Sequence, residues 1–209
     1  MNAREFLLNK MRRMPIVDTH CHHLPDGMYE GVGLQKLLDN SYAAWASPAP
    51  DPADGAAVAQ YVDENLCNTY FRWLFFALEE LYGIPATPAN FPELDRRVRA
   101  AYENPAHHLG VLTDMCRFEK IVNERQPEPG SDLGHPELFF PSFRCDSYFS
   151  GYLSGKPDPN GFLARSTFEN PNVDSIAAYL SEMRRAVARK RDAGCVAVKV
   201  AIAYERPLD

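Results

Sequence analysis

Short runs of apolar residues and stretches of apolar residues at helical spacing alternate along this chain. The short runs are typical of buried strands, and we predict strands at residues 14–18, 119–123, 138–145 and 195–204. Two segments repeat apolar residues every three or four positions and therefore predict helices, at 3–13 and 173–193. Gly194, the expected C-cap residue, closes the second of these helices. Strand and helix signals are thus interleaved.

A long aromatic-rich region separates the first predicted strand from the second. Residues 33–117 carry helical spacing interrupted by proline-rich loops at 47–55 and 84–92. The clearest helical block spans residues 58–82, where apolar side chains recur at spacings of three and four. The pattern predicts a helical insertion whose aromatic residues pack in a core.

This order of elements predicts an α/β fold with a parallel sheet covered by helices. A complete (β/α)8 TIM barrel takes about 250 residues, whereas this chain has 209 residues and devotes many of them to the insertion. We therefore expect the first half of a barrel with about four strands. The expected parts are residues 1–32 with the first helix and strand, 33–117 with the insertion, and 118–209 with strands two to four, the barrel being incomplete at its C-terminal end.

Charge and cysteine usage limit the partners and the compartment. The formal charge of −6 and the lack of a basic stripe argue against nucleic-acid binding. Five scattered cysteines without a C-x-x-C pair are typical of reduced thiols. The N-terminus lacks the apolar core of a signal peptide, and no run approaches the roughly 20 apolar residues that span a bilayer. We expect a soluble cytoplasmic protein without a membrane partner, and a homo-oligomer is compatible with the sequence.

The strongest chemical signal is a pair of histidines at the end of the first strand. His20 and His22 are two residues apart, and in a strand such residues point to the same face. Neutral imidazole is a common ligand of zinc and similar divalent ions. Histidines in an ordinary loop after a buried strand are the alternative interpretation, but the preceding apolar strand and the adjacent Asp18 favour a metal site.

Residues 15–24, Pro-Ile-Val-Asp-Thr-His-Cys-His-His-Leu, resemble the first-strand signature of the amidohydrolase superfamily. Members of that superfamily are metal-dependent hydrolases on a (β/α)8 barrel, and their two histidines bind the more buried metal. The resemblance implies that His20 and His22 bind a divalent ion, with zinc as the expected metal. His23 has no counterpart in the two-histidine motif.

The carboxyl ends of the later strands hold the other candidates, since barrel active sites lie there. Arg144 either binds a substrate carboxylate or phosphate or simply pairs with Asp146. Lys199 either faces the barrel mouth or extends outward from an edge strand, and the resemblance implies a carboxylated lysine that bridges metals. We expect Lys199 and Arg144 to be catalytic, and Arg144, Asp146, Tyr204 and Arg206 to contact substrate. A solvated loop explains the last two equally well.

Two segments resemble uronate isomerases within the superfamily. These are residues 142–146, Ser-Phe-Arg-Cys-Asp, and residues 68–84 in the insertion. The resemblance implies that Arg144 contacts a sugar carboxylate. Strand four departs from it, because residues 198–206 lack the Asp-His-Gly-type segment of those isomerases.

Three functions follow from these patterns. The first is a metal-dependent hydrolase that uses metal-activated water on a small carboxylate-bearing substrate. The second is an aldose–ketose isomerase. The third is a non-catalytic fragment or interaction module, because no histidine follows His135 to complete a metal shell. We expect this 209-residue chain alone to be inactive.

Overall fold

The computed structural model describes residues 2–124, 131–150, 157, 163–170, 172–204 and 207, without the side chains of Ser150 and Tyr204. The chain divides into two compact units. One unit combines Met1–Pro25 with Leu112–Asp209 and contains the sheet, so we call it the sheet unit. The other unit spans Asp26–Val111, and we call it the helical unit.

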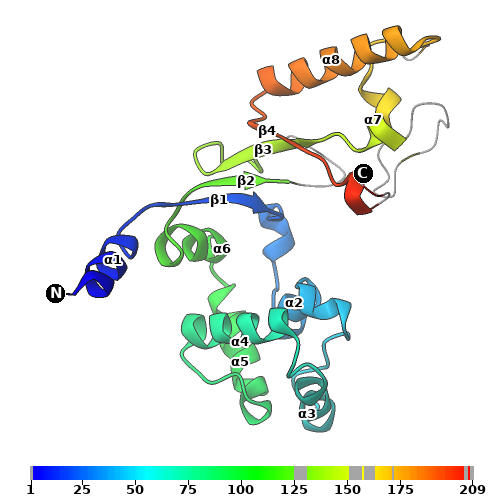
Figure 1. Cartoon of the computed structure of the whole chain (residues 1–209). Coiled ribbons are helices and arrows are strands. Elements are labelled where there is room, and N and C mark those ends of the chain that lie inside the picture. Colours follow the sequence, from blue (N-terminus) through cyan, green and yellow to red (C-terminus); the bar gives the residue numbers. More distant parts are fainter. Residues whose placement is uncertain are drawn as a thin grey trace. The chain divides into compact units, whose positions relative to one another are not determined.

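The sheet unit contains four parallel strands that lie side by side in chain order, as Figure 1 shows. They are β1 (Ile16–Cys21), β2 (Phe118–Asn123), β3 (Phe139–Arg144) and β4 (Ala197–Lys199). All three pairings are parallel, so the carboxyl ends of the strands meet at one edge of the sheet. The predicted mixed α/β architecture with a parallel sheet is confirmed.

The ends of two strands differ from the prediction. β1 continues to Cys21, so His20 lies inside the strand and not after it. β4 stops at Lys199 and is followed by a 3₁₀ helix, η6 (Ile202–Tyr204), where the sequence pattern predicted strand to residue 204. The backbone N–H of Ala201 donates to the Asp146 side chain. This hydrogen bond uses the backbone N–H of Ala201, which a longer β4 would need for pairing with its neighbour. Strand pairing therefore ends there.

Besides η6, the described residues of the sheet unit form the helices α1 (Ala3–Met11), α7 (Ser147–Ser150), η5 (Ala164–Thr167) and α8 (Ile176–Asp192). α8 contributes Tyr179 and Ala186 to a core that also holds Phe143 of β3. Ser175 caps α8 by accepting a hydrogen bond from the N–H of Ala178. The predicted helix at 173–193 therefore forms, starting three residues later than expected.

The helical unit consists of short helices around a second core. They are η1 (Asp26–Tyr29), α2 (Leu34–Asp39), η2 (Tyr42–Trp45), α3 (Gly55–Glu64), α4 (Thr69–Tyr82), η3 (Pro88–Asn90), α5 (Phe91–Ala101) and α6 (His107–Gly110). A π-helical turn, η4 (Val111–Met115), follows α6. Leu34, Phe71, Leu78 and Phe91 are among the fully buried side chains of this core. No helix in the described residues is long and apolar enough to cross a membrane.

The prediction of one helical block over 58–82 is wrong, because α3 and α4 are separate helices. Asn65 follows α3, and its buried side-chain amide donates to the carbonyl of Tyr61 at 2.9 Å. Asn68 then caps α4 by accepting from the N–H groups of Tyr70 and Phe71. Asn68 binds two N–H groups that a continuous helix would pair with the carbonyls of Leu66 and Cys67, so the chain stops and restarts there.

Candidate metal centre

The end of β1 brings two imidazoles together. The Nε2 atoms of His20 and His22 are 3.1 Å apart. Two nitrogens that share a tetrahedral zinc ion at about 2.1 Å lie about 3.4 Å apart. The pairing of β1 with β2 is irregular between Asp18 and Cys21, and the N–H of His20 donates instead to Asp18 Oδ1 at 3.0 Å. Such an irregularity re-aims side chains next to a site.

A hydrogen bond to the backbone fixes the tautomer of His22. Its Nδ1 lies 2.9 Å from the carbonyl oxygen of Glu124. Because a carbonyl oxygen only accepts hydrogen bonds, Nδ1 carries the hydrogen and Nε2 presents a lone pair. Metal-binding histidines are usually held this way, with the second nitrogen donating to a carbonyl or carboxylate.

Glu124 adds a carboxylate to the two imidazoles. It follows β2 directly, and its residue is only 2% exposed. One ligand atom from each of His20, His22 and Glu124 lies within 4.8 Å of the others. Two imidazole nitrogens and a carboxylate oxygen form a donor set that zinc accepts in proteins. The residues present therefore fit a divalent ion.

Arg144, at the end of β3, bonds to two buried carboxylates. Its Nη1 donates to Glu124 Oε1 at 3.1 Å, and its Nε donates to Asp146 Oδ2. The side chains of Glu124 and Asp146 are 3% and 0% exposed, and that of Arg144 is 18% exposed. The other carboxylate oxygen of Asp146 accepts from the N–H of Ala201. Asp146 thus orients Arg144 and also fastens the end of β4.

Lys199, the last residue of β4, reaches the same cluster. Its Nζ lies 3.3 Å from His20 Nδ1 and 3.7 Å from Glu124 Oε2. The pKa of His20 is lowered, first by partial desolvation of the ring and then by the charges of Lys199 and His22. A lowered pKa keeps more of the imidazole neutral, which is the form that binds metal.

Five residues singled out from the sequence therefore meet at the carboxyl edge of the sheet. They are His20, His22, Arg144, Asp146 and Lys199. Arg206 and the side chain of Tyr204 lie outside the described residues, and the backbone of Tyr204 ends η6.

Sequence reasoning missed two polar residues at the end of β2. Asn123 is 1% exposed, and its side-chain oxygen accepts from the N–H of His23 at 2.8 Å. Its amide also donates to the His23 carbonyl, so it holds the chain just after His22. Glu124 comes next and supplies the carboxylate described above. The sequence could have indicated them, because both are polar and directly follow the apolar run of the strand. Arg144 was selected for the same reason, since barrel active sites lie at the carboxyl ends of strands.

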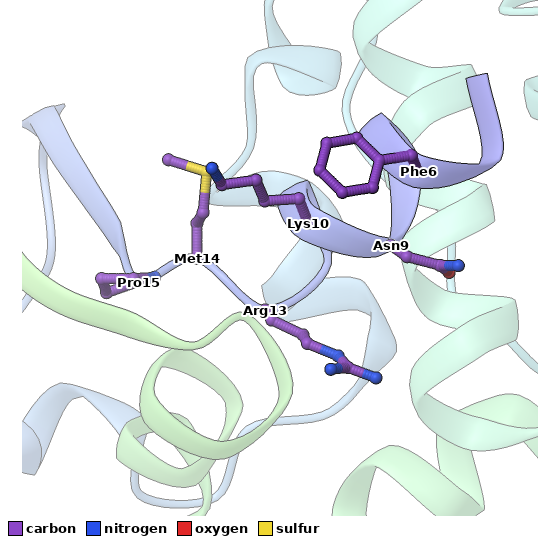
Figure 2. Close-up of a pocket in the computed structure, with 6 residues that line it drawn as sticks. All are labelled: Phe6, Asn9, Lys10, Arg13, Met14 and Pro15. Atoms are coloured by element: carbon purple, nitrogen blue, oxygen red, sulfur yellow. The ribbon is translucent and has the colours of Figure 1, made fainter. Parts of the chain in front are cut away.

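A separate groove lies at the amino end of β1. It has a volume of about 570 Å³ and is lined by Phe6, Asn9, Lys10, Arg13, Met14 and Pro15. Figure 2 shows Phe6, Lys10 and Met14 turned toward one another across it. Its lining contains no carboxylate and no imidazole, so the acid–base and metal-binding groups belong to the other end of the strand.

Comparison with known proteins assigns no family. No family model matches the chain, and no solved structure matches it. The chain is similar to a valine–tRNA ligase from Granulibacter bethesdensis, with 26% identity over 142 residues. That match covers 62% of this chain but 16% of the ligase. The chain thus spans a small part of that enzyme's length, and the similarity leaves the function to be argued from the site.

Proposed function

We propose that this chain carries the metal site of a metal-dependent hydrolase of the amidohydrolase superfamily. In this proposal the sheet unit is the first half of a TIM barrel, and the substrate is a small molecule with a carboxylate. The observation that carries the proposal is the convergence of His20, His22 and Glu124 at the carboxyl ends of β1 and β2. Active sites of such barrels form at that edge.

His20 and His22 would hold the ion, with Glu124 as an oxygen donor. When bound, a divalent ion would lower the pKa of the water molecule attached to it and polarise a substrate carbonyl. The bond from His22 Nδ1 to the Glu124 carbonyl keeps Nε2 aimed at the ion position. Lys199 would complete the shell after carboxylation of its amine, as the family resemblance implies, and its 3.3 Å distance from His20 supports that role.

Arg144 would orient the anionic part of the substrate. A guanidinium held on two sides is pre-organised, and a planar fork matches a carboxylate. Glu124 and Asp146 hold it from two directions. In this proposal Asp146 acts on the substrate through Arg144, because its own oxygens already bond Arg144 and the backbone of Ala201.

One observation favours an isomerase as the second candidate. Arg144 and the buried Asp146 of the uronate-isomerase-like segment form an ion pair beside the candidate metal ligands. In that reaction the ion positions a carbonyl and a hydroxyl while a base moves a proton between adjacent carbons.

Mass spectrometry of products separates the two reactions. The zinc-loaded protein is incubated with lactones, esters and amides of carboxylate-bearing compounds, and with uronates. The hydrolase proposal predicts that a lactone gives one product heavier by one water, and that the two products of an ester or amide together outweigh the substrate by one water. A ketose formed from a uronate at unchanged mass would instead support the isomerase. Neither product with any substrate is the result that the third candidate, a non-catalytic fragment or interaction module, predicts for this chain.

An Arg144→Lys variant tests the substrate carboxylate. It keeps the charge but loses the planar fork. We expect KM to rise for the carboxylate-bearing substrate and to stay unchanged for a neutral analogue. Equal effects on both substrates would remove Arg144 from substrate binding.

A further inference from the structure

Helix α4 is apolar on two opposite faces. Phe71, Leu78 and Tyr82 lie on the inner face and are buried in the core of the helical unit. Tyr70 and Trp73 lie on the outer face, with exposed fractions of 58% and 69%. Large apolar side chains that are exposed together in one patch mark interaction sites, so the outer face has the composition of a contact surface.

The neighbouring 3₁₀ helix η2 extends this surface. The rings of Tyr42 and Trp45 lie 4.6 Å apart, and Tyr42 also meets Tyr70 edge-on at 5.1 Å. On α4, Trp73 contacts Phe76 with ring centroids 5.8 Å apart. We call these five side chains, Tyr42, Trp45, Tyr70, Trp73 and Phe76, the aromatic face. All five are between 45% and 80% exposed.

The size of the aromatic face matches half of a protein interface. Its exposed fractions amount to about three whole side chains, and at 150–250 Å² for each aromatic side chain this is about 600 Å². That is at the upper limit of the largest apolar patch on a typical monomer. Two such faces together bury about 1,200 Å², which reaches the lower end of specific interfaces. Trp, Tyr and Phe are also the residues that interface centres favour.

We propose that two copies of this chain associate through the aromatic face about a twofold axis. Charge on α4 favours a second copy as the occupant. Arg72 and Glu80 are both exposed and lie four residues to either side of Phe76. A twofold axis that passes near Phe76 and is perpendicular to α4 makes the two helices antiparallel, so Arg72 of each copy faces Glu80 of the other. A self-complementary patch of this kind is what an isologous dimer requires.

Sedimentation of charge variants tests the dimer. We expect the wild type to pass from monomer to dimer between about 1 and about 100 µM, since the population of a dimer depends on protomer concentration. Arg72→Glu and Glu80→Arg each put like charges opposite one another and should each raise the dissociation constant at least about tenfold. The double variant exchanges the two charges and should restore the dimer. Glu103→Arg, an equal charge change outside the aromatic face, should have no effect.

Fluorescence gives an independent reading, because Trp45 and Trp73 are the two tryptophans of the chain and both belong to the aromatic face. Dilution of the dimer should shift their emission to the red. Circular dichroism of each variant checks that the helices are kept. If sedimentation finds a monomer at every concentration, the proposal is overturned, whatever the position of the tryptophan emission. So does a dimer that Arg72→Glu and Glu80→Arg leave unchanged.

Discussion

Replacing Arg144 by methionine should destabilise the sheet unit far more than a surface ion pair would suggest. Arg144 neutralises Glu124 and Asp146, whose side chains are 3% and 0% exposed. Methionine keeps most of the side-chain volume but leaves two buried carboxylates without this cation. Lys199 stays 3.7 Å from Glu124 Oε2 and compensates one of the two only in part.

The expected loss is about 3–5 kcal/mol, the usual cost of removing one partner of a buried ion pair. At about 1.4 kcal/mol for each factor of ten, amide protection in β2 and β3 should fall by two to nearly four orders of magnitude. Arg96→Met is the matched control. The side chains of Arg96 and Glu93 are 69% and 36% exposed, so solvent screens this pair and its loss should be small.

Hydrogen exchange followed by mass spectrometry is the suitable assay, because it reads each unit separately. Peptides from β2 and β3 report the sheet unit. Tryptophan fluorescence reports only the helical unit, which contains Trp45 and Trp73, and it should not change in the Arg144 variant. If the free energy of unfolding of the sheet unit is smaller than the expected loss, this unit should unfold in the variant. Its peptides should then exchange as in an unfolded chain, while the helical unit stays protected.

A triple variant distinguishes the cost of unpaired buried carboxylates from the cost of lost packing. Arg144→Met combined with Glu124→Gln and Asp146→Asn leaves neither carboxylate unpaired and should recover most of the lost stability. The asparagine oxygen can still accept from the N–H of Ala201. Unpaired buried charge is not the cause if Arg144→Met costs no more than Arg96→Met, or if the triple variant is less stable than the single one.

Three further predictions concern local structure. Asn123→Ala removes a buried acceptor for the N–H of His23 and should cost about 1–3 kcal/mol in urea unfolding; an unchanged midpoint would contradict it. The pKa of Glu93 is lowered to about 2, first by its hydrogen bonds to arginine side chains of α5, so its contribution to stability is complete above its ordinary pKa and is lost as pH falls through about 2. Acid titration of Glu93→Gln should therefore lack this loss, and the same acid sensitivity in wild type and variant would refute the assignment. Gly83 closes α4 with φ +64, and Gly83→Ala should cost about 1–2 kcal/mol, while Gly55→Ala, which has open space and an ordinary φ, should be neutral or stabilising in thermal denaturation.

The strands and the long helix were predictable because their apolar patterns are local. The histidine pair was also predictable, since the two-residue spacing is local information, although β1 ends at Cys21 and only His20 lies inside the strand. Helix boundaries depended on single hydrogen bonds, such as those of Asn65 and Asn68, and a periodic pattern continues across them. The short β4 likewise depends on Asp146, more than 50 residues away from Ala201.

The composition of the candidate site was predictable only in part. His20, Arg144 and Lys199 were selected one strand at a time, but their mutual distances depend on the order β1-β2-β3-β4. Glu124 was missed because a single carboxylate after a strand is a common surface feature. Its role emerges from burial and from its contacts with His22 and Arg144, which sequence spacing does not encode.

The zinc content of the protein decides whether His20 and His22 form a metal site. The protein is stripped with chelator, dialysed against zinc, freed of loose metal and analysed for its elements, beside a variant with both His20→Ala and His22→Ala. His135→Ala is the control, because His135 lies outside the candidate ligand set. The account predicts one tightly bound ion for each chain in wild type and control, and at least about a hundredfold weaker binding in the double variant. Equal zinc content in all three proteins would contradict the metal site.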